Sequence, residues 1–161
     1  MSTVTCRVPN DEQVGELLAG LLGREVTAAW VPGSWQPPPV GRVASYRTDA
    51  GELAAVAVAD AAFACRAGAA LVLVPAGGAD EAVDAGEIPP QLDENFHEVV
   101  NVMASLLNED GGAHVRLTAV EPLGRSVPTE VAAVVANPSK RRVFHVTVDG
   151  YGRGTVALLF A

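Results

Sequence analysis

The clearest pattern in the chain is an amphipathic helical repeat from Gln91 to Asn108. At 100° per residue, its apolar side chains fall in one arc and its polar side chains in another. The apolar arc contains Leu92, Phe96, Val99, Val100, Met103, Leu106 and Leu107. The opposite polar stripe contains Glu94, Glu98, Asn101 and Ser105. Residues three or four apart are neighbours on a helix, so we predict that the stripe is one continuous, solvent-exposed surface.

Before this helix, the patterns of apolar and turn-forming residues predict four elements. They are a helix over 11–22 that ends at Gly23, a strand over 25–31, a proline-rich loop over 32–39, and a β-hairpin with strands over 40–48 and 52–59. Residues 61–74 allow two interpretations: one helix that ends before Pro75, which we favour, or a shorter helix followed by a strand at LVLV. Residues 75–90 are predicted to form an acidic loop or a short helical turn.

After the amphipathic helix, the pattern is mainly that of strands. We predict a strand over 114–122, a loop over 123–129, a second hairpin with strands over 131–136 and 142–149, and a last strand over 155–160. The order helix, strand, loop and hairpin therefore occurs twice, over 10–59 and over 91–149. Aligning the two helices at an offset of 82 pairs Glu12 with Glu94, Glu16 with Glu98, and Ala19 with Asn101.

This repeated order predicts an α+β fold. We expect a single domain, residues 1–161, with a mainly antiparallel sheet and long helices packed on one face in a pseudo-repeat of helix-strand-hairpin. With 161 residues, the chain is long enough to bury a substantial core. Only 5% of its residues are aromatic, which argues against a stacking site for bases or flat cofactors.

The charge of the chain argues against nucleic acid as a partner. The formal net charge is −8, and a phosphate backbone repels an acidic surface. The densest basic run, Lys140-Arg141-Arg142, lies in a predicted turn, where a solvated hairpin tip is the simpler interpretation.

Neither cysteines nor targeting signals point outside the cytoplasm. The two cysteines, Cys6 and Cys65, are too few and too far apart for a disulfide framework. The start of the chain has no basic-then-apolar signal pattern, and the longest apolar run, 67–76, is too short to span a bilayer. We therefore expect a soluble cytoplasmic protein without a membrane partner.

Ordinary catalytic and metal motifs fail on inspection. The three histidines, His97, His114 and His145, lack the tight spacing of metal ligands, so we predict no metal site. The GYGRG segment lacks the spacing of a phosphate-binding loop, and no serine stands in a nucleophile-elbow context. The polar stripe could be a merely solvated face, but Asn101 is a mediocre helix former that such a face does not need.

The stripe resembles the signature of the CheC/CheX family of chemotaxis phosphatases. That signature is an acidic or small polar residue, Glu four residues later, Asn three residues after that, and Pro roughly two dozen residues on. In this chain it is matched by Glu94, Glu98, Asn101 and Pro122. The order of predicted elements over 10–161 is also similar to the layout of the family.

The resemblance implies hydrolysis of the aspartyl phosphate on a CheY-like receiver domain. By the match, Asn101 would orient the attacking water and Glu98 would pair with the receiver's active-site lysine. Glu94 and Ser105 would contact the partner, Ser105 by allowing close approach. No cofactor of its own is implied, because the Mg²⁺ belongs to the receiver domain. With Ala19 in place of a second Asn, the chain is closer to the CheX-like pattern, which implies one site and a homodimer.

Two alternatives stay open at this point. A binding or adaptor module of the same fold would recognise a partner without hydrolysing its phosphate, and it would not need the Glu98/Asn101 pair. A small-molecule enzyme or ligand-binding domain is the third interpretation.

Overall fold

A computed structural model describes residues 6–124 and 126–161. The helices of this part are α1 (Asp11–Leu22), α2 (Ala61–Leu71), α3 (Ala76–Ala85), α4 (Pro90–Met103), the 3-10 helix η1 (Ala104–Leu106) and α5 (Thr129–Ala136). The strands are β1 (Val26–Trp30), β2 (Gly41–Thr48), β3 (Leu53–Asp60), β4 (Val115–Pro122), β5 (Lys140–Val148) and β6 (Gly152–Phe160). Among these residues, no helix is both long enough and apolar enough to cross a membrane.

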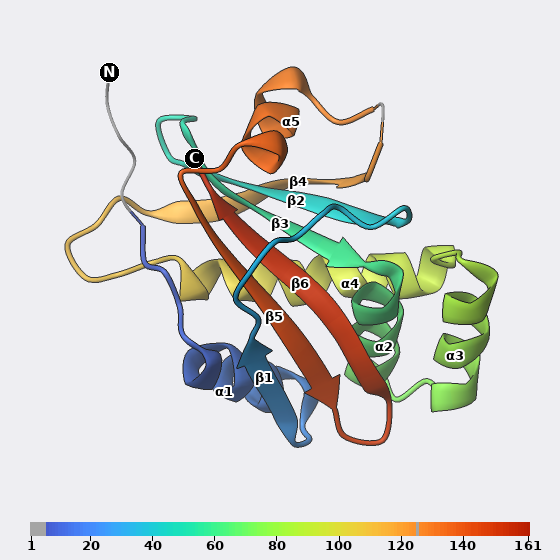
Figure 1. Cartoon of the computed structure of the whole chain (residues 1–161). Helices are drawn as coiled ribbons and strands as arrows, with labels where there is room; N and C mark the ends of the chain where they lie inside the picture. The colour runs from blue at the N-terminus through green and yellow to red at the C-terminus, as the bar shows by residue number, and fades with distance from the viewer. Residues whose placement is uncertain (1–5, 125) are drawn as a thin grey trace.

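The strands form one antiparallel sheet in the order β1-β5-β6-β3-β2-β4 (Figure 1). Exchanging α1-β1-β2-β3 with α4-β4-β5-β6 turns this order into its own reverse. The two halves are therefore related by a pseudo-twofold axis between the central strands β3 and β6, which pair over 55–59 and 156–160. The predicted α+β class, with its antiparallel sheet and its helix-strand-hairpin repeat, is confirmed.

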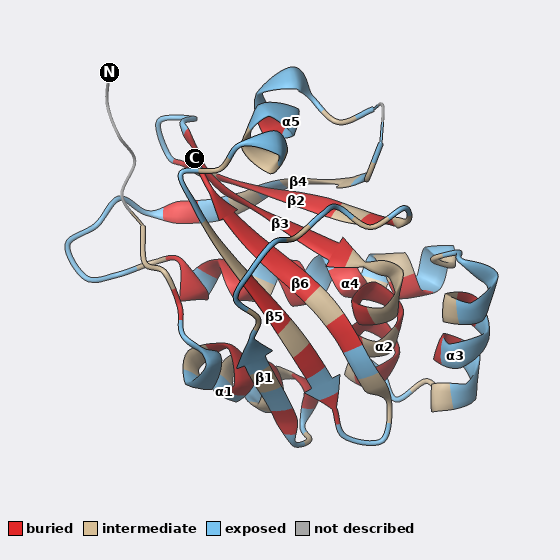
Figure 2. Cartoon of the chain, in the orientation of Figure 1, coloured by how far each residue is buried: buried red, intermediate tan, exposed pale blue. Residues whose placement is uncertain are grey.

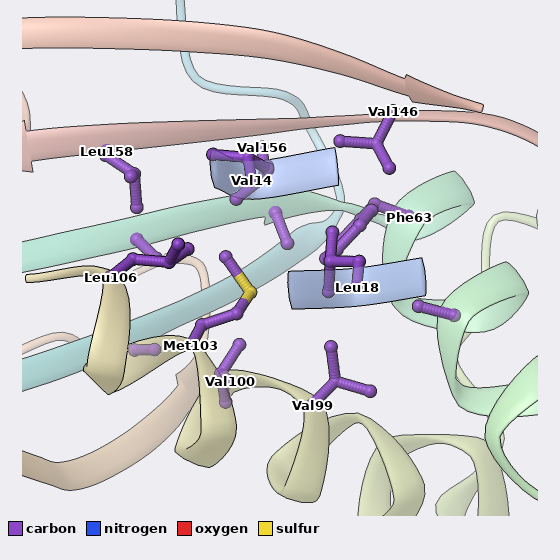
Figure 3. Close-up of a cluster of buried hydrophobic side chains, with 14 of the residues drawn as sticks. Val14, Leu18, Phe63, Val99, Val100, Met103, Leu106, Val146, Val156 and Leu158 are labelled. Atoms are coloured by element: carbon purple, nitrogen blue, oxygen red, sulfur yellow. The ribbon is translucent and has the colours of Figure 1, made fainter. Parts of the chain in front are cut away.

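The main core lies between the sheet and the helices α1, α2 and α4, and α4 crosses behind the central strands in Figure 1. Side chains from all three helices meet those of the strands there (Figure 3). Those labelled in the figure on helices and strands include Val14, Leu18, Phe63, Val99, Val100, Met103, Val146, Val156 and Leu158. Along β6, Val156 and Leu158 point into this core, whereas the alternate residues Ala157 and Leu159 point to the opposite face. This alternation is expected for a strand that is covered on both faces.

A smaller core covers the opposite face of the sheet. It is built from strand residues that point away from α4, together with the buried Val131 of α5. Trp35, from the proline-rich loop 32–39, packs against the same cluster. Long helices thus pack on one face, as predicted, and one short helix and a loop cover part of the other.

The prediction of a strand over 131–136 is wrong, because this segment forms α5. Its buried and half-buried positions are Val131, Val134 and Val135, a spacing of three and four that matches one side of a helix rather than the alternation of a strand. Neighbouring strands already pair on both sides of β5, which leaves no sheet position next to it for this segment. The basic run at 140–142, predicted as a turn, starts β5 instead.

Three further predictions around α2, α3 and α4 differ from the structure. The helix expected to reach Val74 ends at Leu71, and Leu73 follows with a left-handed φ of 60°. Within the segment predicted to be an acidic loop or short helical turn lies the ten-residue helix α3, which buries Ala79 and Ala82 against α2 and ends at the left-handed Gly86. The helix predicted over 91–108 is α4 up to Met103, and it continues as η1 to Leu106.

Candidate functional site

The predicted stripe lies on the solvent-facing side of α4. Glu94, Glu98, Asn101 and Ser105 are all exposed. The apolar arc is buried as predicted, at Leu92, Phe96, Val99, Val100, Met103, Leu106 and Leu107. Figure 2 shows the resulting mixture of buried and exposed segments along α4. One helix therefore serves both as a core element and as a surface.

Most of the stripe has no polar partner among the described residues. In the residues that the structure describes, the side chains of Glu94, Glu98 and Asn101 make no hydrogen bond or ion pair. The Ser105 hydroxyl, in contrast, donates to the carbonyl of Val102 at 3.0 Å. Glu98 and Asn101, one turn apart, thus retain their full hydrogen-bonding capacity for an external group.

The middle of α4 is held against the core by side-chain contacts from other elements. The Tyr46 hydroxyl donates a 2.6 Å hydrogen bond to the carbonyl of Val100. Burial raises the pKa of Tyr46 above its usual range, which favours the protonated hydroxyl that donates this bond. The rings of Phe63 and Phe96 meet edge to face, with 6.0 Å between their centroids. The helix segment that carries Glu98 and Asn101 is therefore held in place on its core-facing side.

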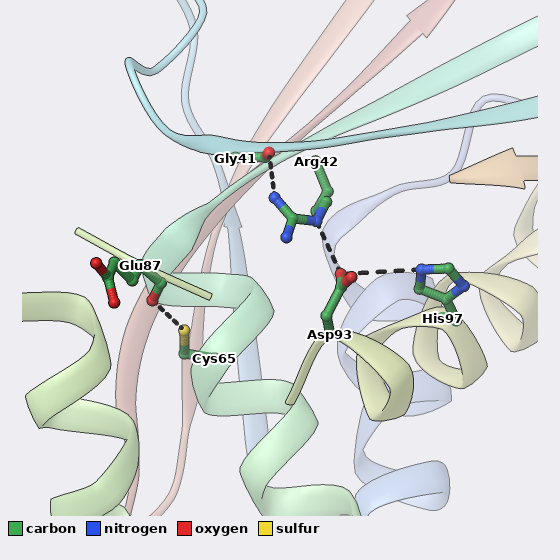
Figure 4. Close-up of polar contacts among 6 residues, drawn as sticks. All are labelled: Gly41, Arg42, Cys65, Glu87, Asp93 and His97. Carbon is green, nitrogen blue, oxygen red and sulfur yellow. Dashed lines mark hydrogen bonds and ion pairs between the residues drawn. The ribbon is translucent and has the colours of Figure 1, made fainter. Parts of the chain in front are cut away.

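The N-terminal half of α4 is tied to β2 (Figure 4) and, through a second contact, to α2. Arg42 Nε donates to Asp93 Oδ1 at 2.8 Å, and its Nη1 donates to the carbonyl of Gly41 at 3.1 Å. Asn95 Nδ2 donates to the carbonyl of Gly68 at 3.1 Å, where α2 and α4 approach closely. A Cβ on Gly68 would lie 2.6 Å from the carbonyl oxygen of Leu92, so only glycine fits this crossing.

The C-terminal end of the helix is capped by Arg7, which is distant in sequence, and by the nearby Asn108. Arg7 donates from Nε to the carbonyl of Leu106 and from Nη2 to that of Ser105, each at 2.8 Å. The Asn108 amide bridges η1 to β4, donating to the Ala104 and Val115 carbonyls and accepting from the Val115 backbone. A cation at the carbonyl end of a helix is favourable. Sequence reasoning missed Arg7, because nothing local connects it to a helix almost a hundred residues away.

The histidines and cysteines lie apart from one another. His97, at the edge of the stripe, lies 3.8 Å from Asp93, while His145 contacts Thr155 in the sheet. Among the described residues, no group of three or more His, Cys, Asp and Glu could hold a metal ion. Buried Cys65 donates from Sγ to the carbonyl of Glu87 at 3.6 Å (Figure 4), and burial raises its thiol pKa to about 11.

The equivalent helix of the first half, α1, presents a different surface. Glu12 and Glu16 are exposed like Glu94 and Glu98. Ala19, however, is only half-exposed and packs against the main core. The carboxylate–carboxamide pair thus occurs on α4 and has no equivalent on α1.

Comparison with known proteins finds similarity in structure but not in sequence. No protein-family model matches the chain, and no curated protein matches it either. Solved structures do match. A chain of the FliM–SpeE complex from H. pylori has a TM-score of 0.65 and 10% identity over 93% of this chain and 80% of that one. The FliG–FliM complex from H. pylori gives a TM-score of 0.56 at 11% identity, over 93% and 85%.

The third neighbour is FliY from Thermotoga maritima. Its TM-score is 0.52, its identity 16%, and the match covers 94% of this chain and 89% of that one. The chain has the FliM/FliY fold. These proteins share the CheC/CheX-like architecture, so the expected architecture is confirmed. At such low identity, the likeness concerns the fold and leaves the role of the stripe to its own chemistry.

Proposed function

We propose that this protein hydrolyses the aspartyl phosphate of a CheY-like receiver domain through Glu98 and Asn101 on α4. The observation that carries the proposal is this pair: a carboxylate and a carboxamide, one turn apart and exposed, on a helix anchored along its length. Among the described residues, neither side chain has a polar partner. The CheX-like resemblance of the motif supports the same assignment.

The chemistry divides between two proteins. The receiver domain supplies the phosphoryl group, the Mg²⁺ and a lysine, so this chain needs no cofactor of its own. Water attacks phosphorus, the bond from phosphorus to the aspartyl oxygen breaks, and inorganic phosphate and the free carboxylate result. The Asn101 amide orients that water, and Glu98 pairs with the lysine. Positioning of this kind supplies much of the rate of phosphoryl transfer.

The rest of the stripe recognises the partner. Glu94 is exposed one turn before Glu98 and adds negative charge to the same contact. Ser105 follows one turn after Asn101, and its hydroxyl is turned back to its own helix. A small, internally satisfied side chain allows another protein to approach the helix closely. The proposal carries with it a cytoplasmic location and, from the CheX-like pattern, a homodimer.

The test is the decay of phosphate on receiver domains. Receiver domains of the organism are charged with acetyl phosphate and followed with and without this protein. Asn101→Ala and Glu98→Ala should each lose the acceleration by 10²-fold or more, because one positioned group contributes about that much. The matched control is Glu16→Ala, the equivalent glutamate on α1, which should keep full activity. Accelerated decay by Asn101→Ala would overturn the assignment.

A second candidate is a binding module without catalysis. It is favoured by two of the structural neighbours, whose solved structures are complexes with the proteins SpeE and FliG. Such a module would bind a receiver domain or another protein and leave the phosphate lifetime unchanged. Measuring binding and decay on the same samples distinguishes the two, because only the phosphatase changes the decay.

A further inference from the structure

A hollow of about 540 Å³ opens on the face of the sheet opposite α4, between α5, the proline-rich loop and the loop after β4. We call it the α5 groove. Most of the side chains that line it are apolar, among them Trp35, Pro38, Val127, Ala132 and Val135. Its size is within the range of small-molecule sites, which are typically concave, apolar and about 300–1,000 Å³.

One charged side chain lines the α5 groove among the described residues, and that is Arg141. Its Nη2 donates to the carbonyl of Gly33 at 2.7 Å, which holds the guanidinium against the proline-rich loop. A guanidinium has five N–H donors, so this bond leaves others for a ligand. Within the described residues, Arg141 forms no ion pair.

The lack of a carboxylate partner for Arg141 among the described residues is unusual for a protein in which acidic side chains outnumber basic ones. Arg42, Arg47 and Arg66 each pair with a carboxylate, although the net charge of −8 leaves fewer cations than anions. Beside Arg141, the exposed Lys140 and the half-buried Arg142 also lack an ion pair among the described residues. Arg142 stacks instead on the ring of Trp30, at 4.7 Å. Neither Lys140 nor Arg142 lines the groove, so among the described residues Arg141 is the single uncompensated cation of its lining.

We propose that the α5 groove binds a small amphipathic monocarboxylate, such as a medium-chain fatty acid. Its apolar body would lie along Trp35 and the α5 side chains, and its carboxylate would pair with Arg141. Apolar lining with a single uncompensated guanidinium matches a ligand with an apolar body and one negative charge. This proposal is independent of the phosphatase proposal, because the groove lies on the other face of the sheet from α4.

The α5 groove is preformed, because both of its walls are held in place without a ligand. The segment 37–39 is three consecutive prolines, whose rings fix the backbone φ angle. On the other side, α5 is anchored by the buried Val131, and Glu130 pairs with Arg47 of β2 at 3.0 Å. A preformed site spends little of its binding free energy on ordering.

The first test uses isothermal titration with decanoate below its micellar concentration, and decanol as the uncharged counterpart. Decanoate should bind saturably with one site per chain, and decanol should bind about tenfold more weakly, because a charge-assisted hydrogen bond is lost. Arg141→Gln should weaken decanoate about tenfold, whereas Lys140→Gln, the same charge change one residue away and outside the lining, should not. Equal binding of decanol, or equal losses in both variants, would overturn the proposal.

A second pair of variants tests the location. Ala132 and Ala133 are both exposed on α5, but only Ala132 lines the groove. Ala132→Trp should fill the hollow and abolish decanoate binding, while Ala133→Trp should leave binding unchanged. Thermal unfolding of each variant verifies that α5 remains folded. No saturable binding of decanoate to the unaltered protein would reject the proposal outright, and so would binding that survives Ala132→Trp.

Discussion

The helices α1 and α4 hold equivalent places in the two halves of the fold, but they are stabilised in different ways. Local residues define α1. Asn10 accepts from the Gln13 backbone at 2.8 Å and its own backbone donates to the Gln13 side chain at 2.9 Å, which completes a capping box. Gly23, with a left-handed φ of 66°, ends the helix. The sequence around α1 is enough to start and stop it.

Distant residues define α4. It begins after Pro89 without a side-chain cap, and residues from β2, α2 and the N-terminal segment hold it in place. Those contacts are the bonds from Tyr46, Arg42 and Arg7, and the tight crossing at Gly68. The exposed pair on α4 is thus positioned by contacts from several other elements of the fold. Four experiments can test this contrast.

The largest effect is expected at the contact of α4 with the core. Phe96→Ala removes a ring that is 1% exposed and touches Phe63, so we expect a loss of about 3–5 kcal/mol in the free energy of unfolding. Urea denaturation measures the loss. Phe96→Leu, which keeps most of the volume, is the milder comparison. A loss below about 1 kcal/mol for Phe96→Ala would mean that α4 is not fixed by this contact.

A smaller and more local effect is expected at the ends of the two helices. Arg7→Ala removes two hydrogen bonds to the carbonyl end of α4 and should cost about 1–2 kcal/mol. Asn10→Ala removes the cap of α1 and should cost about 1 kcal/mol. Hydrogen exchange followed by mass spectrometry separates them, because Arg7→Ala should loosen α4 and Asn10→Ala should loosen α1. Identical exchange maps for both variants would contradict the contrast between the helices.

The same contrast explains what could be predicted from the sequence. The periodicity of apolar residues predicted α1, the apolar arc of α4 and the strands of the sheet, because burial on one side leaves a direct mark on the pattern. The pattern at 131–136 predicted a strand for two reasons. Its valines are β-branched and favour strands, and their helical spacing, at Val131, Val134 and Val135, covers only two turns. Because β1 and β6 already pair with the two edges of β5, this segment cannot pair with β5 and forms a helix on the sheet instead.

The site was predictable to a similar extent. Glu98 and Asn101 and their exposure followed from the helical wheel of one segment. The groups that hold them in place did not, because Arg7, Arg42 and Tyr46 lie in other segments and no local pattern relates them to α4. Arg141 shows the same limit: its run suggested a solvated turn, and only the folding of the proline-rich loop onto β5 brings it to a groove.

Two glycines sharpen the comparison at a still smaller scale. Gly20 of α1 is exposed, and a Cβ there would meet nothing within 4 Å. Gly20→Ala should therefore stabilise the protein by about 0.5–1 kcal/mol, through helix propensity and a less flexible unfolded chain. Gly68→Ala should destabilise it, because the added Cβ would collide with the backbone of α4. Thermal unfolding measures both, and shifts of the same sign would contradict this difference between the open surface of α1 and the tight crossing of α2 with α4.

The last experiment is expected to show no change in activity. It tests why α4 carries a glutamate–asparagine pair and α1 does not. Ala19→Asn, made in the Asn101→Ala background, places a carboxamide three residues after Glu16, as in the spacing of the natural pair. We expect no recovery of receiver dephosphorylation. Ala19 is partly buried against the core, so a carboxamide there would lack the free, solvent-facing position of Asn101. Recovered activity would show that spacing alone is sufficient, and that exposure and the distant anchors of α4 contribute little. The absence of recovery, with the fold verified by thermal unfolding, would tie the proposed activity to the exposed and anchored position of Asn101 on α4.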